Sequence, residues 1–191
     1  MLNKAKLLEL LNAPMSKSQI LGVSAVLNIR GFQIRDLIDL TFNENKKIAF
    51  RAAWLLENIF LMHPQYYIND IGYLIESFNL ITHGSCKRHY AKIAMHITSP
   101  KAKPFIKYVL SQTDIEPLLG KCFEWMMDPN VLVAVKSFAA EALFNLRHRY
   151  TWISEELPAI LRILIQEGSA AIRNKGEKLL AYLYPLTYDG S

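Results

Sequence analysis

Apolar residues recur at helical spacing along the chain, most clearly between Pro129 and Leu146. The apolar positions of this stretch follow one another at steps of three and four residues: Leu132, Val135, Ala139, Ala142 and Leu146, with Val131 and Phe138 alongside. This pattern predicts an amphipathic helix with one wide apolar face, and Pro129 supplies a start signal near its first turn. The small side chain of Ala139 in the middle of that face lets a second helix approach closely.

Three further stretches carry the same pattern, at residues 45–62, 85–98 and 169–184. When all four are aligned on their small mid-helix residue, the anchor positions are Ala53, Ala91, Ala139 and Gly176, which are 38, 48 and 37 residues apart. The residues three positions later are also apolar: Leu56, Ala94, Ala142 and Leu179. A period near 40 residues with one amphipathic helix in each period predicts a helical solenoid.

The last repeat resembles a known family most closely. Leu157-Pro158 opens an apolar helix, Gly168-Ser169 makes a short turn, and Ile172-Arg173 leads into a second helix through Gly176. This order resembles the proline-bearing first helix, turn and hydrophobic-arginine pair of HEAT and armadillo-like repeats. The resemblance covers roughly residues 32–184. It implies an all-α fold, an α-α superhelix (HEAT-like repeat solenoid) of about four helix pairs with an N-terminal helical cap.

At 191 residues the chain fits a single domain. We expect two cap helices within residues 1–31, the second starting with a capping box at Ser16 and Gln19 and stopping at Gly31. The repeats are expected at residues 32–64, 65–98, 99–149 and 150–185. The second repeat would open with one helix from Tyr66 to Ile81. An additional short helix at Phe105–Leu110 would account for the longest gap between anchors.

Motifs of catalysis and cofactor binding are missing from the sequence. It contains no phosphate-binding glycine loop, no nucleophile elbow and no HExxH zinc motif. Cys86 and His89 have a metal-like spacing with His83 close by, but His96 lies two helical turns beyond His89, roughly 10 Å away at 1.5 Å per residue. We therefore predict no enzymatic activity, no metal and no cofactor.

Cysteine usage and hydropathy bear on the cellular setting. Cys86 and Cys122 form neither a disulfide framework nor a metal-ligand pattern, so a reducing, cytoplasmic location is expected. The longest run without a charged residue, Asn58 to Asn69, has only 12 residues, which is too short to span a membrane. The N-terminal segment lacks the pattern of a signal peptide.

The positive charge is concentrated in one segment. The net charge is +5, yet the segment from Ser77 to Thr113 holds none of the 17 acidic residues and six of the 22 basic ones, so the rest of the chain is nearly neutral. The six are Lys87, Arg88, Lys92, Lys101, Lys103 and Lys107. A concentrated positive field favours anionic partners such as nucleic acid, acidic peptide segments or phosphorylated groups.

Polar residues in this segment form a stripe along the predicted helix of residues 85–98, at Ser85, His89, Lys92 and His96. One repeat earlier, the equivalent stripe is Lys47, Arg51, Trp54 and Asn58. In the family that the chain resembles, second helices line the concave binding surface. The resemblance thus implies a basic groove with Trp54 as an aromatic platform, formed by Lys47, Arg51, Trp54, Asn58, Arg88, His89, Lys92 and His96. Alternatively, these charges are an ordinary solvated face and Trp54 packs under the cap.

Two functions are consistent with these features. The first is a non-catalytic interaction or scaffold module that binds a partner, most simply a protein, along its repeat surface. The alternative is a nucleic-acid-binding protein resembling HEAT-like DNA alkylation-repair glycosylases, which pair concave-surface aromatics with an acidic residue. The nearest pairs here are Trp54 with Glu57 and Trp125 with Asp128. Trp125 falls on a first helix and Glu57 lies one position off the Trp54 stripe, so we favour the first function.

Overall fold

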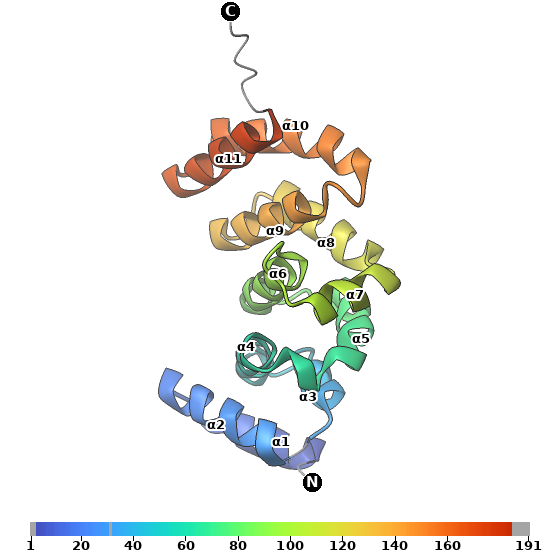
Figure 1. Cartoon of the computed structure of the whole chain (residues 1–191). Helices are drawn as coiled ribbons and strands as arrows, with labels where there is room; N and C mark the ends of the chain where they lie inside the picture. The colour runs from blue at the N-terminus through green and yellow to red at the C-terminus, as the bar shows by residue number, and fades with distance from the viewer. Residues whose placement is uncertain (1–2, 31, 185–191) are drawn as a thin grey trace, which may run out of the picture.

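The computed structural model describes residues 3–30 and 32–184, with the backbone alone at residues 26–30. These ranges form eleven α-helices and no β-strand, which confirms the predicted all-α class. The helices stack from the α1–α2 pair at one end to the α10–α11 pair at the other (Figure 1). Their bounds are α1 Lys4–Asn12, α2 Lys17–Arg30, α3 Ile34–Leu40, α4 Lys46–Met62, α5 Ile71–Glu76, α6 Gly84–Thr98, α7 Pro104–Gln112, α8 Glu116–Met127, α9 Val133–Leu146, α10 Thr151–Glu167 and α11 Ala170–Leu183.

The helices form two layers. The second helices α2, α4, α6, α9 and α11 pack against one another in that order, and α3, α8 and α10 pack on α4, α9 and α11. All four predicted anchors are buried, which confirms their place at helix contacts: Ala53, Ala91, Ala139 and Gly176. A Cβ atom added at Gly176 would lie 2.8 Å from Cγ1 of Ile165. Helices α10 and α11 therefore approach too closely for a side chain at that anchor unless Ile165 moves.

Local signals place several helix starts. The Ser16 backbone N–H donates to Oε1 of Gln19 (2.7 Å), and the Gln19 N–H donates to Oγ of Ser16 (3.3 Å), so the predicted capping box is present at the start of α2. Asn45 begins α4 in the same way by accepting the Lys47 N–H (3.0 Å). Gly31, the predicted end of α2, lies outside the described residues.

The start of α9 differs from the prediction. The helix begins at Val133, and residues 128–132 form a turn in which the Val131 N–H donates to the Asp128 carbonyl (3.2 Å). Leu132 has extended backbone geometry and its side chain is 61% exposed. Because it precedes the first helical turn, it leaves the apolar stripe in which we had placed it. Val135, Ala139 and Ala142 are buried as predicted.

The expected single helix from Tyr66 to Ile81 is broken into short pieces. Two 3-10 turns, Pro64–Tyr66 and Ile68–Asp70, precede α5, and a third, Ser77–Leu80, follows it. The Ser77 hydroxyl donates to the Leu74 carbonyl (2.6 Å), a side-chain bond that competes with the helical backbone ladder. The first helix of this repeat is consequently much shorter than periodicity indicated.

Helix α7 is the additional short helix that the anchor spacing predicted, and it starts with Pro104 in its first turn. It packs on α6 and on the turn at Ile68–Asp70 (Figure 1). The Arg149 guanidinium donates to the carbonyls of Leu110 (2.6 Å) and Thr113 (3.2 Å), which ties the end of α7 to the end of α9. Among the described residues, no helix combines the length and hydropathy that a membrane crossing requires.

Candidate functional site

The predicted binding residues lie on α4 and α6, which pack side by side in the second layer. Their exposure differs sharply. Lys47, Arg88 and His96 are exposed, and His89 is buried. The other four are half-buried: Arg51, Trp54, Asn58 and Lys92. The structure therefore brings the two predicted stripes together without forming an open row of free charges.

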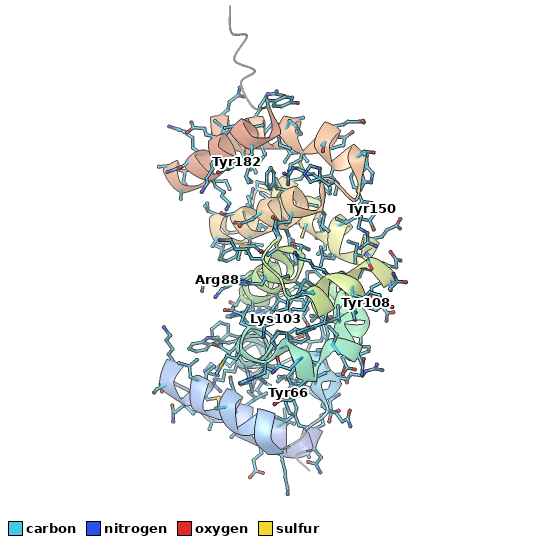
Figure 2. All side chains as sticks on the ribbon, viewed as in Figure 1. Tyr66, Arg88, Lys103, Tyr108, Tyr150 and Tyr182 are labelled. Atoms are coloured by element: carbon cyan, nitrogen blue, oxygen red, sulfur yellow. The ribbon has the colours of Figure 1, made fainter. Side chains whose placement is uncertain are left out.

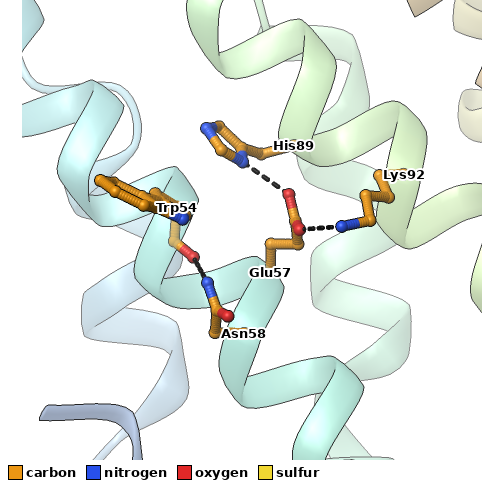
Figure 3. A network of polar contacts seen from close by, with 5 residues as sticks. All are labelled: Trp54, Glu57, Asn58, His89 and Lys92. Atoms are coloured by element: carbon orange, nitrogen blue, oxygen red, sulfur yellow. Dashed lines mark hydrogen bonds and ion pairs between the residues drawn. The ribbon is translucent and has the colours of Figure 1, made fainter. Parts of the chain in front are cut away.

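A buried carboxylate joins the two helices. Glu57 of α4 is only 7% exposed. Its Oε2 atom accepts a hydrogen bond from Nδ1 of His89 (2.6 Å), and its Oε1 atom accepts one from Nζ of Lys92 (2.5 Å), as Figure 3 shows. The two donors occupy the same helix, α6, one turn apart. Glu57 thus links the α4 and α6 repeats through two charge-assisted contacts.

Burial raises the pKa of the Glu57 carboxyl, but the hydrogen bonds from His89 and Lys92 lower it further, so its pKa lies below the ordinary value. The carboxylate is therefore ionised at neutral pH and offsets the charge of Lys92. Helical periodicity placed Glu57 one position off the Trp54 stripe and did not indicate this contact. His89 and Lys92 lie 32 and 35 residues further along the chain, and no local signal in the sequence pairs them with Glu57.

His89 is the clearest correction to the predicted site, because its side chain is 4% exposed rather than solvent-facing. Helix α6 packs against α4 on one side and against α9 on the other, so the polar positions that face these neighbours are covered. The His89 ring lies on the α4 side, where its centroid is 5.4 Å from that of Phe50. Its Nε2 atom is buried and has no hydrogen-bond partner among the described residues.

Arg51 and Trp54 also serve the structure. Nη1 of Arg51 donates to the carbonyls of Leu11 (2.9 Å) and Asn12 (3.1 Å), where its charge complements the C-terminal end of α1. The Trp54 ring packs against the core beside Phe50, with centroids 5.8 Å apart. Arg51 therefore ties α4 to the N-terminal helix α1, and Trp54 is partly covered by the core.

Three of the predicted residues remain free on the surface. Lys47, Arg88 and His96 have no carboxylate within 4.0 Å among the described residues. Asn58 contacts its own helix, since its Nδ2 donates to the Trp54 carbonyl (2.8 Å). Burial and then the neighbouring Lys92 lower the pKa of His96, so His96 is neutral at pH 7, and the exposed positive charges among the predicted residues are those of Lys47 and Arg88.

Neither cysteine is placed for chemistry. Cys86 and Cys122 are free and buried, and burial raises the pKa of each thiol to about 12, so both are protonated at neutral pH. Sγ of Cys86 lies 3.6 Å from Nδ1 of His83. Within residues 3–30 and 32–184, no group of three or more histidine, cysteine or acidic side chains is arranged to hold a metal ion.

In the two pairs that the alternative function would use, Trp54 with Glu57 and Trp125 with Asp128, the side chains already make other contacts. Trp125 is fully buried, with its ring 6.0 Å from that of Phe78, and Asp128 lies 3.9 Å from Nζ of Lys87. Glu57 is engaged by His89 and Lys92. Neither pair presents an exposed aromatic beside a free carboxylate.

Paired helices stacked in two layers, with small residues at the contacts and ties between neighbouring repeats, define an α-helical repeat protein. A family model described as a HEAT repeat domain matches residues 7–182, and the chain belongs to this family. The match begins within α1, so it extends beyond the residues 32–184 that carried the resemblance and includes most of the two N-terminal helices. No curated protein and no solved structure matches the chain.

Proposed function

We propose that this protein is a non-catalytic interaction module that binds a partner protein along its repeat surface and favours an anionic partner. Membership of the HEAT repeat family supports a role in protein interaction or scaffolding, since stacked repeats offer long continuous surfaces. The reducing, cytoplasmic setting expected from the cysteines is part of the same proposal.

One observation carries the preference for an anionic partner. Of the six cations between Ser77 and Thr113, only Lys87 and Lys92 have a carboxylate within 4.0 Å among the described residues. The other four have none: Arg88, Lys101, Lys103 and Lys107. Positive charge without a nearby counter-charge raises the local concentration of anionic partners and speeds their association.

The rigidity of the stack adds to this argument. Neighbouring second helices are joined by the Glu57 contacts between α4 and α6 and by an ion pair of Glu141 with Lys175 between α9 and α11. A surface that is already ordered loses little conformational entropy when a partner binds.

The test uses a partner captured by cross-linking in native lysate and then purified. Its affinity for the wild type is compared with that for the variant Arg88→Ala/Lys101→Ala/Lys103→Ala/Lys107→Ala. A control variant removes the same charge at exposed lysines elsewhere: Lys6→Ala/Lys17→Ala/Lys46→Ala/Lys178→Ala. We expect the first variant to lose at least tenfold in affinity, about 1.4 kcal/mol, and the control to lose far less.

The dependence of affinity on salt adds a second measurement. A partner protein bound through these cations should show a flatter salt dependence with the first variant than with the wild type. Equal losses with the two variants would contradict the proposal. If the captured partner is instead a nucleic acid, log affinity should fall against log salt with a slope of about −0.7 per phosphate contacted on a single strand, and the alternative function would replace ours.

A further inference from the structure

Two shallow clefts lie on either side of the loop that leads from α6 into α7. The first has a volume of about 180 Å³ and an apolar floor that includes Phe60, Ile93 and Ile106. Its rim carries His96, Lys101 and Lys103. Figure 2 labels Lys103 on this loop, next to the start of α7. Of the three exposed residues of the predicted stripes, His96 lines this cleft, whereas Lys47 and Arg88 do not.

The second cleft, of about 330 Å³, lies between the ends of α6, α7 and α9. Its floor includes Ile97 and Leu110, and its rim carries Lys107, His148 and Arg149. No aspartate or glutamate lines either cleft. Both clefts thus combine an apolar floor with a rim that is entirely neutral or positive.

Some of the rim cations are held in place without being neutralised. Nζ of Lys107 donates to the Pro100 carbonyl (2.5 Å), and Arg149 donates to the carbonyls of Leu110 and Thr113. Carbonyl groups orient these cations but carry no net charge, so the positive field persists. In the first cleft, Nζ of Lys103 lies 5.9 Å from the ring centroid of Phe105, which favours one position of its side chain.

We propose that the α6–α7 loop and α7 form the docking site for an acidic segment of a partner protein, with one aliphatic side chain of that segment in the first cleft. The carboxylates of the segment would contact Lys101, Lys103 and Lys107. This inference rests on the proposed function and names the surface and partner chemistry. Helix α7 is an addition to the two-helix repeat, and insertions of this kind tend to lie on the binding face of repeat proteins.

The shape of the first cleft favours a peptide over a nucleic acid. Its walls are mainly aliphatic, and a small pocket of this kind suits a leucine-sized side chain. Single-stranded nucleic acid is usually held by aromatic platforms on which bases stack, and the exposed aromatic of α7, Tyr108, lies outside both clefts. The rim supplies the charge complement of acidic residues next to the anchor.

The experiment uses short fluorescein-labelled peptides of glutamate and aspartate with one central leucine, and a matched peptide with alanine in its place. The wild type should bind the leucine peptide about tenfold more tightly than the alanine peptide, because an aliphatic side chain becomes buried. Lys101→Ala/Lys103→Ala should weaken binding of the leucine peptide about tenfold. Lys46→Ala/Lys178→Ala, which removes the same charge at distant exposed sites, should change it less than twofold.

A third variant isolates the apolar cleft from the charge. Ala102 is half-buried and lines the first cleft, so Ala102→Trp fills it and should abolish the difference between the two peptides. Ser99→Trp is a second filling variant at the same cleft, used if Ala102→Trp fails to fold by circular dichroism. Retention of the leucine preference in a folded, filled variant would overturn the proposal.

Other results would overturn it as well. These are equal binding of the two peptides by the wild type, equal weakening of binding by the two lysine-pair variants, and tighter binding of a thymidine oligonucleotide that displaces the peptide. A purely structural role for Lys101 and Lys103 at the end of α6 predicts a lower melting temperature with unchanged peptide binding. If the captured partner is lost by the fourfold charge variant but not by Lys101→Ala/Lys103→Ala or Ala102→Trp, the proposed function stands and this docking site is wrong.

Discussion

Two polar contacts between neighbouring second helices make an instructive comparison. Glu57 joins α4 to α6 through Lys92 and His89, and Glu141 joins α9 to α11 through Lys175. The side chain of Glu57 is 9% exposed, whereas that of Glu141 is 35% exposed. Both contacts bridge adjacent repeats with a carboxylate and a lysine, and they differ mainly in how far the carboxylate is removed from water.

That difference changes what each contact contributes to stability. The Glu141–Lys175 pair is partly exposed, and such a pair contributes about 0–1 kcal/mol because water solvates the separated charges nearly as well. A buried carboxylate has lost its hydration, so removing it or its donors leaves polar groups unpaired in the interior. The α4–α6 contact is therefore sensitive to mutation, and the α9–α11 contact tolerates it.

A charge introduced into the apolar core next to these contacts should cause the largest loss of stability. Ala139 is fully buried in α9, and Ala139→Glu would place an unpaired charge among tightly packed side chains. We expect a loss of about 4 kcal/mol in the free energy of unfolding, measured by urea denaturation. Ala159→Glu makes the same change at an exposed position within α10 and should cost less than about 1 kcal/mol. Similar losses for both would show that the helix faces are assigned incorrectly.

Removing the two carboxylates tests the comparison directly. Glu57→Ala leaves Nδ1 of buried His89 without its acceptor and should cost about 3 kcal/mol in the free energy of unfolding. Glu141→Ala leaves a lysine that can turn toward water and should cost less than about 1 kcal/mol. Urea denaturation at neutral pH gives both values. Equal costs would mean that burial does not distinguish the two contacts.

Acid should weaken the buried contact. Because the pKa of Glu57 is lower in the folded chain than its ordinary value of 4.5, its stabilising contribution is complete above about pH 4.5 and is lost as pH falls through the lower folded pKa. Urea denaturation between neutral pH and about pH 3 should show a smaller acid loss for Glu57→Gln than for the wild type. Parallel curves for the two proteins would rule out this contribution of Glu57.

The smallest effect concerns the close helix approach at the α11 anchor. Gly120 lies in α8, and a Cβ added there would meet nothing within 4 Å beyond the backbone of its own helix, so Gly120→Ala should raise stability by about 0.5–1 kcal/mol through helix propensity. Gly176→Ala gains the same propensity but must displace Ile165, and we expect it to be less stable than Gly120→Ala. Thermal unfolding of the two variants checks the order, and equal gains would mean that α10 and α11 separate at little cost.

Much of the fold follows from the sequence alone. The apolar period identified the four anchor positions, the longest gap between them indicated the extra helix before α8, and residue spacing identified the capping box at Ser16 and Gln19. The structure contains all of these. These features arise from interactions within a few residues, such as helix starts and the 3.6-residue repeat, so a local pattern is sufficient to specify them. Leu132 was misplaced because a turn, which periodicity does not register, ends just before Val133.

The candidate site, in contrast, was decided by the tertiary structure. Glu57 reaches His89 across 32 residues, and Arg51 reaches the carbonyl of Asn12 across 39. Whether such side chains face water or another helix depends on the stacking of whole repeats, which turns a polar position on one helix into a buried contact with the next. Helical periodicity determines the face of a helix on which a residue lies, and only the neighbouring repeats determine what covers that face.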